Sequence, residues 1–279
     1  MKIFLAVFDG YRMSDSTIQY AIQVTQAVDG HLVGVFLDDF FYRSYDVRSA
    51  LTASGNPDKA IQELDEKDKK KRDSSVLLFQ KQCSKAGIKY SVHRNTNVAV
   101  QELKNQSMFA DLIIVNENET FTKYKEKLPT RFIKNVLGDI QCPVMVVPGK
   151  YRAVDKIVLL YDGRPSALYA IKLFSYLFGN ILDMPIEVFT VNEHSQNLRL
   201  PENKLMREFI KRHFPKAQFK IAKGNAEEQI VGYLRDHKEN ELVVLGAYRR
   251  SELSRWFKTS MADILMKELN TPLFIAHSS

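Results

Sequence analysis

The sequence predicts two consecutive doubly wound α/β units, each built around a five-stranded parallel sheet. Three observations lead to this prediction. Short apolar runs alternate with longer segments of helical pattern along the chain, which is typical of strands joined by helical crossovers. The same succession of segments occurs twice, so that the chain contains an internal repeat. The length of 279 residues also fits two domains of ordinary size.

The repeat is clearest in three pairs of apolar segments. The first pair leads into Asp-Gly, the second begins with an acidic residue, and the third has proline at its second position. These segments are 2–10 and 156–163, 111–115 and 241–245, and 142–147 and 271–276. We therefore expect domains at 1–150 and 151–279. Because the linker at 149–152 is short, the two domains are expected to pack together.

Strands and helices are predicted to alternate in each copy. In the first copy we expect strands at 2–8, 31–37, 88–93, 110–116 and 142–147, and helices at 14–28, 57–86, 97–107 and 129–139. In the second copy we expect strands at 155–161, 185–191, 216–222, 241–246 and 272–276, and helices at 165–179, 201–214, 225–237 and 259–270. Right-handed helical crossovers would cover both faces of each sheet, which gives a Rossmann-like fold.

The first copy contains an insertion that is predicted to be one long helix. Asp9 and Asp162 are 153 positions apart, whereas Asp111 and Glu241 are 130 apart, so the first copy has about 23 more residues before its fourth strand. Asn56-Pro57 is a good helix start and Gly87 a good stop. Residues 65–73 are charged with mixed sign, and we interpret them as solvated middle turns. A docking helix for a protein partner is the alternative.

Composition limits the classes of function. The hydrophobic fraction is 45%, and the net charge is +7. This charge alone does not predict nucleic-acid binding, which needs Lys and Arg on one face. The apolar run at 3–8 is too short for a signal peptide, and no stretch reaches membrane-span length. Cys83 and Cys142 have neither framework nor metal-ligand spacing, so we expect free thiols and a reduced, cytoplasmic protein without a membrane partner.

No catalytic motif stands out in the sequence. The chain lacks the Gly-x-Ser-x-Gly elbow of α/β-hydrolases, a Walker loop and a Gly-x-Gly-x-x-Gly loop. None of its histidines has metal-ligand spacing with another His or Cys, so no metal is expected. These histidines are His31, His93, His194, His213, His237 and His277. We expect a protein that is not a turnover enzyme.

The order of these segments resembles the universal stress protein family. The features that carry the resemblance are a first strand leading into Asp-Gly, a fourth strand ending in Gly246, a long loop, Ser260, a helix and a fifth strand after Pro272. The pattern covers essentially the whole chain twice, so the chain looks like a tandem member. The resemblance implies the adenine nucleotide alpha hydrolase-like version of the Rossmann fold in both copies.

In nucleotide-binding members, the fourth strand is followed by Gly-x-x-Gly, nine residues, then Gly and Ser or Thr. Here Gly246 and Ser260 match, whereas Arg249 and Thr259 replace the other two glycines. The resemblance also implies that Asp162 hydrogen-bonds adenine and that the strand end near Thr190 and Val191 supplies backbone contacts. The candidate ligand set is therefore Asp162, Val191, Gly246, Arg249, Thr259 and Ser260, for ATP or AMP in the second domain only.

Two interpretations of this loop stay open. The Cβ atoms of Arg249 and Thr259 would hinder close approach of the backbone to phosphates, which favours a solvated basic loop. Basic side chains beside a helix start would instead attract an anion, which favours a nucleotide site. Trp256-Phe257 could stack on a base, although such a pair more often anchors a loop.

The first copy departs further from the motif. Its fourth strand leads into Asn116-Glu117-Asn118-Glu119, with no glycine and with two carboxylates that would repel a triphosphate. The counterpart of the later motif lies near Thr130-Arg131. Asp9 is interpreted as an ordinary turn residue. We expect this half not to bind nucleotide.

The leading functional hypothesis is a cytoplasmic stress-response regulatory protein that senses an adenine nucleotide. The alternative is a nucleotide-independent interaction scaffold with an unknown protein partner, and a slow ATPase is a weaker third hypothesis. Residues 144–147 and 273–276 are the fifth strands, which commonly pair edge to edge in this family. The resemblance thus implies an internal pseudo-dimer, and a homodimer of whole chains stays open.

Overall fold

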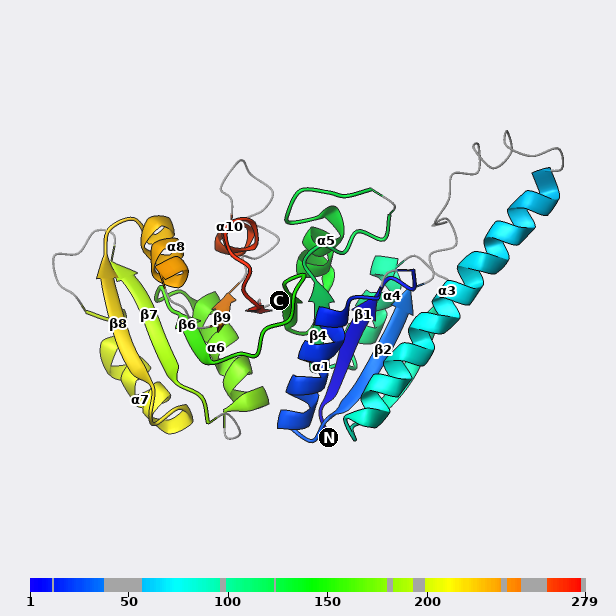
Figure 1. Ribbon diagram of the computed structural model, residues 1–279. Coiled ribbons are helices and arrows are strands. Elements are labelled where there is room, and N and C mark those ends of the chain that lie inside the picture. The colour runs from blue at the N-terminus through cyan, green and yellow to red at the C-terminus, as the bar shows by residue number, and fades with distance from the viewer. Residues whose placement is uncertain are drawn as a thin grey trace.

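The computed structural model describes residues 1–11, 13–37, 57–95, 99–122, 124–179, 183–192, 199–236, 240–246 and 260–276. Within these residues, strands from both halves of the chain form one sheet with the order β3-β2-β1-β4-β5-β10-β9-β6-β7-β8 (Figure 1). In each half the first strand is flanked by the second and the fourth. This order reverses direction at the first strand, as in doubly wound α/β folds.

The elements alternate as expected. In the first half they are β1 (Ile3–Phe8), α1 (Asp15–Ala27), β2 (His31–Leu37), α3 (Pro57–Lys85), β3 (Lys89–Asn95), α4 (Ala99–Ser107), β4 (Leu112–Asn116), α5 (Arg131–Asp139) and β5 (Val144–Val147). In the second half they are β6 (Lys156–Leu160), α6 (Pro165–Phe178), β7 (Ile186–Asn192), α7 (Asn203–His213), β8 (Gln218–Lys223), α8 (Ala226–Asp236), β9 (Glu241–Gly246), α10 (Met261–Glu268) and β10 (Leu273–Ala276). The predicted strand and helix boundaries are confirmed to within about two residues wherever the ends are described.

The strands are parallel within each half and antiparallel at the junction. β1 pairs with β2 and β4, and β6 pairs with β7 and β9, all in parallel register. β5 and β10 run antiparallel, with Phe274 opposite Met145. These two fifth strands therefore join the halves into one sheet.

Helices cover both faces of the sheet, so that its strands are apolar on both sides. One apolar cluster lies under α1, α3, α6 and α7, and the other lies under α4, α5, α8 and α10. Each cluster contains residues from both halves. Phe4 of β1 and Phe178 of α6, for example, have ring centroids 6.1 Å apart. The two halves consequently share their cores.

The segment between β5 and β6 is held by hydrogen bonds to both halves. The Asn240 side chain before β9 donates to the carbonyls of Arg152 (2.8 Å) and Ala153 (3.1 Å). The Arg152 amide donates to the hydroxyl of Tyr20 on α1 (3.4 Å). A short linker fastened in this way fits the expectation that the halves pack together.

The long helix α3 differs from the expectation of solvated middle turns. Asp68 is only 4% exposed. The Arg72 guanidinium donates to the Tyr11 hydroxyl and lies over its ring at 4.3 Å, and Asp73 pairs with Arg94 at 2.7 Å. The solvated interpretation is therefore wrong for one face of this charged segment, because the loop after β1 and strand β3 pack against it. The predicted cap Asn56 lies outside the described residues.

Two expectations about the chain as a whole can be compared with the described residues. None of the helices described is long and apolar enough to cross a bilayer. Cys83, within α3, and Cys142, before β5, are both free thiols and both buried.

Candidate functional site

The candidate site of the second half lies where three parallel strands end. β6, β7 and β9 are neighbours in parallel register, so their carboxyl ends meet at one edge. α6 begins shortly after β6, and α10 is the next described element after β9, so both helix N-termini face this edge as well. Ligands of doubly wound folds bind at such edges.

Asp162 follows β6 at this edge, and its side chain is 55% exposed. Its Oδ1 accepts a hydrogen bond from the Arg164 amide at 2.9 Å, and Oδ2 lies 3.6 Å from Arg164 Nε. The intervening Gly163 has φ +83°, a conformation that favours glycine. Asp162 is thus both a turn residue and an exposed carboxylate.

Gly246 ends β9 against the first turn of α6. A Cβ atom at this position would lie 2.5 Å from the Ser166 carbonyl carbon and 2.7 Å from the Ala167 nitrogen. Only glycine lets the strand end approach the helix start this closely. No side chain caps the N-terminus of α6, where Pro165 occupies the first turn. The amide groups of this turn therefore lie beside the end of β9.

Ser260 is the N-cap of α10. Its Oγ accepts a hydrogen bond from the Asp263 amide at 3.1 Å, which satisfies one of the free amides of the first turn. A serine is thus explained by capping alone. Helix N-termini also attract anions, and a capping hydroxyl lies at that end of the helix. Ser260 therefore caps α10, and the same position would also allow its hydroxyl to contact an anionic ligand.

The end of β7 contributes backbone rather than side chains. Thr190 is buried, and its hydroxyl donates to the Tyr161 carbonyl at the end of β6. Val191 pairs with Ala222 of β8, and its side chain packs partly against the apolar cluster under α8. Four of the six predicted site residues thus belong to this edge by topology. Arg249 and Thr259, like Trp256 and Phe257, lie outside the described residues.

The corresponding edge of the first half is filled by its own side chains. Asp9 is 4% exposed, in contrast to Asp162, and its Oδ1 accepts from the Tyr11 amide at 2.9 Å. Glu119 reaches back from the loop after β4. Its Oε1 accepts from the amides of Thr120 (3.0 Å) and Phe121 (3.3 Å), and the Asp9 amide also hydrogen-bonds its carboxyl group.

The charge state of Glu119 is unusual. Complete burial is the main cause that raises its pKa to about 7, and the neighbouring Asp9 carboxylate raises it further. Burial also raises the pKa of Glu117, although the Gly149 amide donates to Glu117 Oε1 at 3.2 Å. These carboxyl groups point into the protein. The two carboxyl groups that the sequence predicts to repel a triphosphate are thus buried at this edge, and the repulsion itself stays a prediction.

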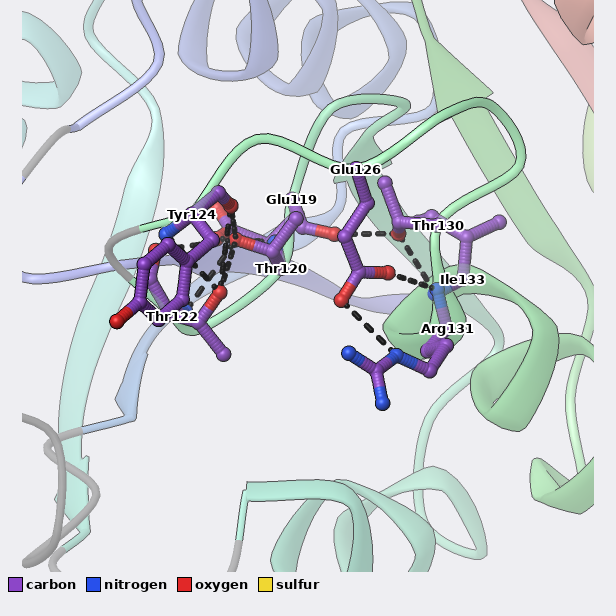
Figure 2. A network of polar contacts seen from close by, with 8 residues as sticks. All are labelled: Glu119, Thr120, Thr122, Tyr124, Glu126, Thr130, Arg131 and Ile133. Carbon is purple, nitrogen blue, oxygen red and sulfur yellow. Dashed lines mark hydrogen bonds and ion pairs between the residues drawn. The ribbon is translucent and has the colours of Figure 1, made fainter.

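Figure 2 shows how the loop after β4 is held in this position. Thr130 Oγ1 donates to the Glu119 carbonyl at 2.5 Å and accepts from the Ile133 amide at 3.2 Å. The same hydroxyl therefore caps α5 and holds the loop after β4 in place. Glu126 accepts from the amide and the Nε of Arg131, at 2.7 and 3.1 Å. Thr130 and Arg131, the predicted counterpart of the later part of the nucleotide motif, thus both make their contacts with residues of the first half.

Comparison with solved structures identifies the fold. No protein-family model and no curated protein matches the chain. A universal stress protein from Archaeoglobus fulgidus DSM 4304 is similar over 99% of this chain and 98% of its own, with a TM-score of 0.68 and 16% identity. The chain has the fold of the universal stress proteins. The predicted fold class is confirmed by this likeness over the full length.

Two structures from Pseudomonas aeruginosa show the same likeness. A putative universal stress protein from strain UCBPP-PA14 has a TM-score of 0.61 at 14% identity and covers 99% of this chain and 93% of its own. A functionally unknown protein from strain PAO1 also has a TM-score of 0.61, at 15% identity, and covers 99% and 92%. At such identities the likeness concerns the universal stress protein fold and not the ligand.

A buried polar cluster lies at the opposite end of β6, and sequence reasoning did not single it out. Lys156 Nζ lies 2.8 Å from the Tyr233 hydroxyl and 3.4 Å from Glu187 Oε2, and the same hydroxyl donates to Glu187. Phe189 stacks on the Tyr233 ring with centroids 4.3 Å apart. These contacts join β6, β7 and α8, and we assign the cluster a structural role. The sequence signal for this cluster is weak: Lys156 and Glu187, of opposite charge, stand at the beginnings of β6 and β7.

Proposed function

We propose that this chain is a stress-response regulatory protein of the universal stress type, which binds an adenine nucleotide, ATP or AMP, at the second-half edge. One contrast carries the proposal. Asp162 presents an exposed carboxylate at the end of β6, whereas Asp9, at the matching place in the first half, is buried beside Glu119. An exposed carboxylate can accept a hydrogen bond from the exocyclic amine of adenine.

The phosphate end of the proposed nucleotide would meet a positive edge. The N-terminus of α6 has no side-chain cap, and the N-terminus of α10 lies at the same edge. Helix N-termini stabilise phosphate groups through their free amides and the helix dipole. The sequence between β9 and α10 contains Arg249, Arg250, Arg255 and Lys258. These cations would compensate for the two missing motif glycines.

The regulatory rather than catalytic assignment is part of the proposal. The sequence contains no catalytic motif, and the charged neighbour of Asp162 at this edge is Arg164, whose Nε lies 3.6 Å from Asp162 Oδ2. A slow ATPase stays the weaker hypothesis. Phosphate release that disappears in Asp162→Ala would support it and would overturn the assignment as a pure sensor.

The direct test is to measure nucleotide binding. Small molecules released from freshly purified protein are identified by mass spectrometry, and ATP and AMP are then titrated by calorimetry. Loss of the hydrogen bond to a charged carboxylate should weaken binding about 10- to 100-fold in Asp162→Ala. Arg249→Glu should also weaken ATP binding. The control is Asp183→Ala, which removes an exposed carboxylate next to β7 and should leave affinity unchanged.

The scaffold hypothesis predicts the opposite outcome. Absence of released nucleotide, together with no heat at millimolar ATP or AMP, would overturn the sensor proposal. One observation favours the scaffold: Leu77 and Leu78 on α3 are 65% and 46% exposed beside its charged turns. Adjacent exposed leucines on a long helix suit a protein partner. Substitution of both by Glu would then abolish partner binding and leave folding intact.

A further inference from the structure

A cavity of about 60 Å³ lies between the two halves, away from the candidate nucleotide site. Ala27 of α1, Met145 of β5, Phe174 of α6 and Phe274 of β10 line it, so both halves contribute to its wall. Ile157, at the beginning of β6, lines it as well. The cavity is therefore at the far end of β6 from Asp162.

Among the described residues that line the cavity, all are apolar except Gln23 of α1. The Gln23 Oε1 atom is buried and has no hydrogen-bond partner within the part of the chain that the structure describes. Buried polar atoms in folded proteins are nearly always hydrogen-bonded, and leaving one without a partner costs stability. An apolar cavity with a single buried acceptor in its wall is complementary to an apolar molecule that carries one donor.

We propose that this cavity is a binding site for a small aliphatic alcohol, whose hydroxyl group hydrogen-bonds Gln23 and whose carbon chain lies against Met145, Phe174 and Phe274. The size supports this class. One water-sized position needs about 10–15 Å³ of such volume, so the cavity accommodates a guest of about four to six non-hydrogen atoms. A butanol or pentanol has this size.

A hydroxyl group fits this wall better than an amine or a hydrocarbon. An ammonium group would lose its hydration, and the described part of the wall offers it no opposite charge. A hydrocarbon would leave Gln23 Oε1 without a donor. A hydroxyl both donates and accepts, so it satisfies either end of the Gln23 amide.

Occupation of the cavity would strengthen the junction of the halves. The wall includes α1 and β5 from the first half and α6 and β10 from the second, and the bound molecule would contact both. A ligand that binds only the folded protein stabilises it, and the stabilisation grows as the logarithm of ligand concentration once this exceeds Kd. The site thus has an effect that does not depend on whether the second-half edge binds nucleotide.

The test uses the methionine methyl groups of the full chain as reporters in NMR spectra. Met145 and Met184 line the cavity, whereas Met206 and Met266 are buried elsewhere and serve as internal controls. Butan-1-ol should shift the Met145 and Met184 signals in a saturable way. Its isomer methyl propyl ether has the same atoms but no donor, and should bind roughly fivefold more weakly because one hydrogen bond is lost.

Two variants separate the parts of the proposal. Ala27→Leu fills the cavity and should abolish the saturable shifts, with Ala27→Val as the milder substitution if the first does not fold. Gln23→Leu should keep ether binding and remove the preference for the alcohol, whereas Gln19→Leu, one turn earlier, should keep both. The proposal is overturned if the shifts are not saturable below alcohol concentrations that unfold the protein. Equal shifts at Met206 and Met266, or an unchanged preference in Gln23→Leu, overturn it too.

Discussion

Glu119 illustrates how strongly one side chain depends on its surroundings. It is a residue of a polar loop, yet it lies buried beside Asp9 and accepts hydrogen bonds from backbone amides. Asp162 follows β6 as Asp9 follows β1, but it stays exposed. Among the described residues, the inward-pointing carboxyl group of Glu119 thus accompanies the burial of Asp9.

The raised pKa of Glu119 predicts how stability varies with pH. The folded protein keeps a proton up to about pH 7, whereas the unfolded chain releases it near the ordinary pKa of 4.5. Stability should therefore fall as the pH rises from about 4.5 to 7 and level off above. The contribution is roughly 2–3 kcal/mol between pH 5 and pH 8. Glu119→Gln cannot titrate and should lose this part of the dependence.

Urea unfolding at pH 5 and pH 8 measures the effect. Glu63→Gln, on an exposed part of α3, is the control and should keep the pH dependence of the parent protein. An identical dependence in the parent protein and in Glu119→Gln would show that Glu119 is not a buried, protonated group.

Both cysteines should be inert in the folded protein. Burial raises the pKa of Cys83 and of Cys142 to about 12, so little thiolate exists at pH 8. Iodoacetamide should alkylate neither residue in native protein, whereas urea-unfolded protein should react completely. Peptide mass spectrometry gives the extent at each site. Alkylation of Cys83 without unfolding would contradict the described packing of α3.

For single residues, the sequence predicted where a residue lies along the strands and helices better than it predicted which groups surround its side chain. Ser260 could be placed at a helix start because a cap needs such a residue type, whereas Gly246 was predicted only through the family resemblance, and its close approach to α6 is seen in the structure. The inward direction of Glu119 could not be predicted, since a loop side chain is oriented by partners far away in the sequence. Asp9 is 110 positions away from it, and the two meet only once β1 and β4 are neighbours.

At the scale of elements, β9 and α6 depend on a glycine at their contact. In Gly246→Ala the new Cβ would lie 2.5 Å from backbone atoms of Ser166, which cannot move away as a flexible side chain could. We expect a loss of stability of about 2 kcal/mol or more, as for other overpacked sites. The measurement is thermal or urea unfolding.

Gly232 provides the matched control for this substitution. It lies within α8, and a Cβ there would meet no atom within 4 Å. Gly232→Ala should raise stability by up to about 1 kcal/mol, because alanine is the better helix former. Destabilisation by both substitutions alike would show that the contact with Ser166 is not the cause.

Element boundaries were predictable because the determining signals are local. Apolar runs, the proline and glycine at the ends of α3, and the capping residues of α5 and α10 act within a few positions. The face that α3 turns toward the sheet was not predictable in the same way. Its charged turns contain Asp68 and Arg72, whose contacts come from distant segments.

At the scale of the whole molecule, the two halves should unfold together. Phe274 of β10 is fully buried among Phe174 and Phe178, within the cluster that also contains Phe4 of the first half. Phe274→Ala should cost about 3–5 kcal/mol. Hydrogen exchange should then show equal loss of protection in β1 and in β7, although β1 lies in the other half.

Phe132→Ala is the comparison, since Phe132 is buried in α5 against Phe121 of the same half. It too should lower protection in β7 if the chain is one cooperative unit. Reduced protection restricted to the mutated half would instead indicate two independent folding units.

The antiparallel pairing of β5 with β10 has a consequence for how such a protein can change over time. Two identical subunits that associate through this strand must carry the same ligand edge, because any substitution appears in both. A covalently joined pair has no such restriction, and its association does not weaken on dilution. One half can therefore keep an exposed carboxylate at Asp162 while the other, with Glu119 buried, persists as its permanent structural partner.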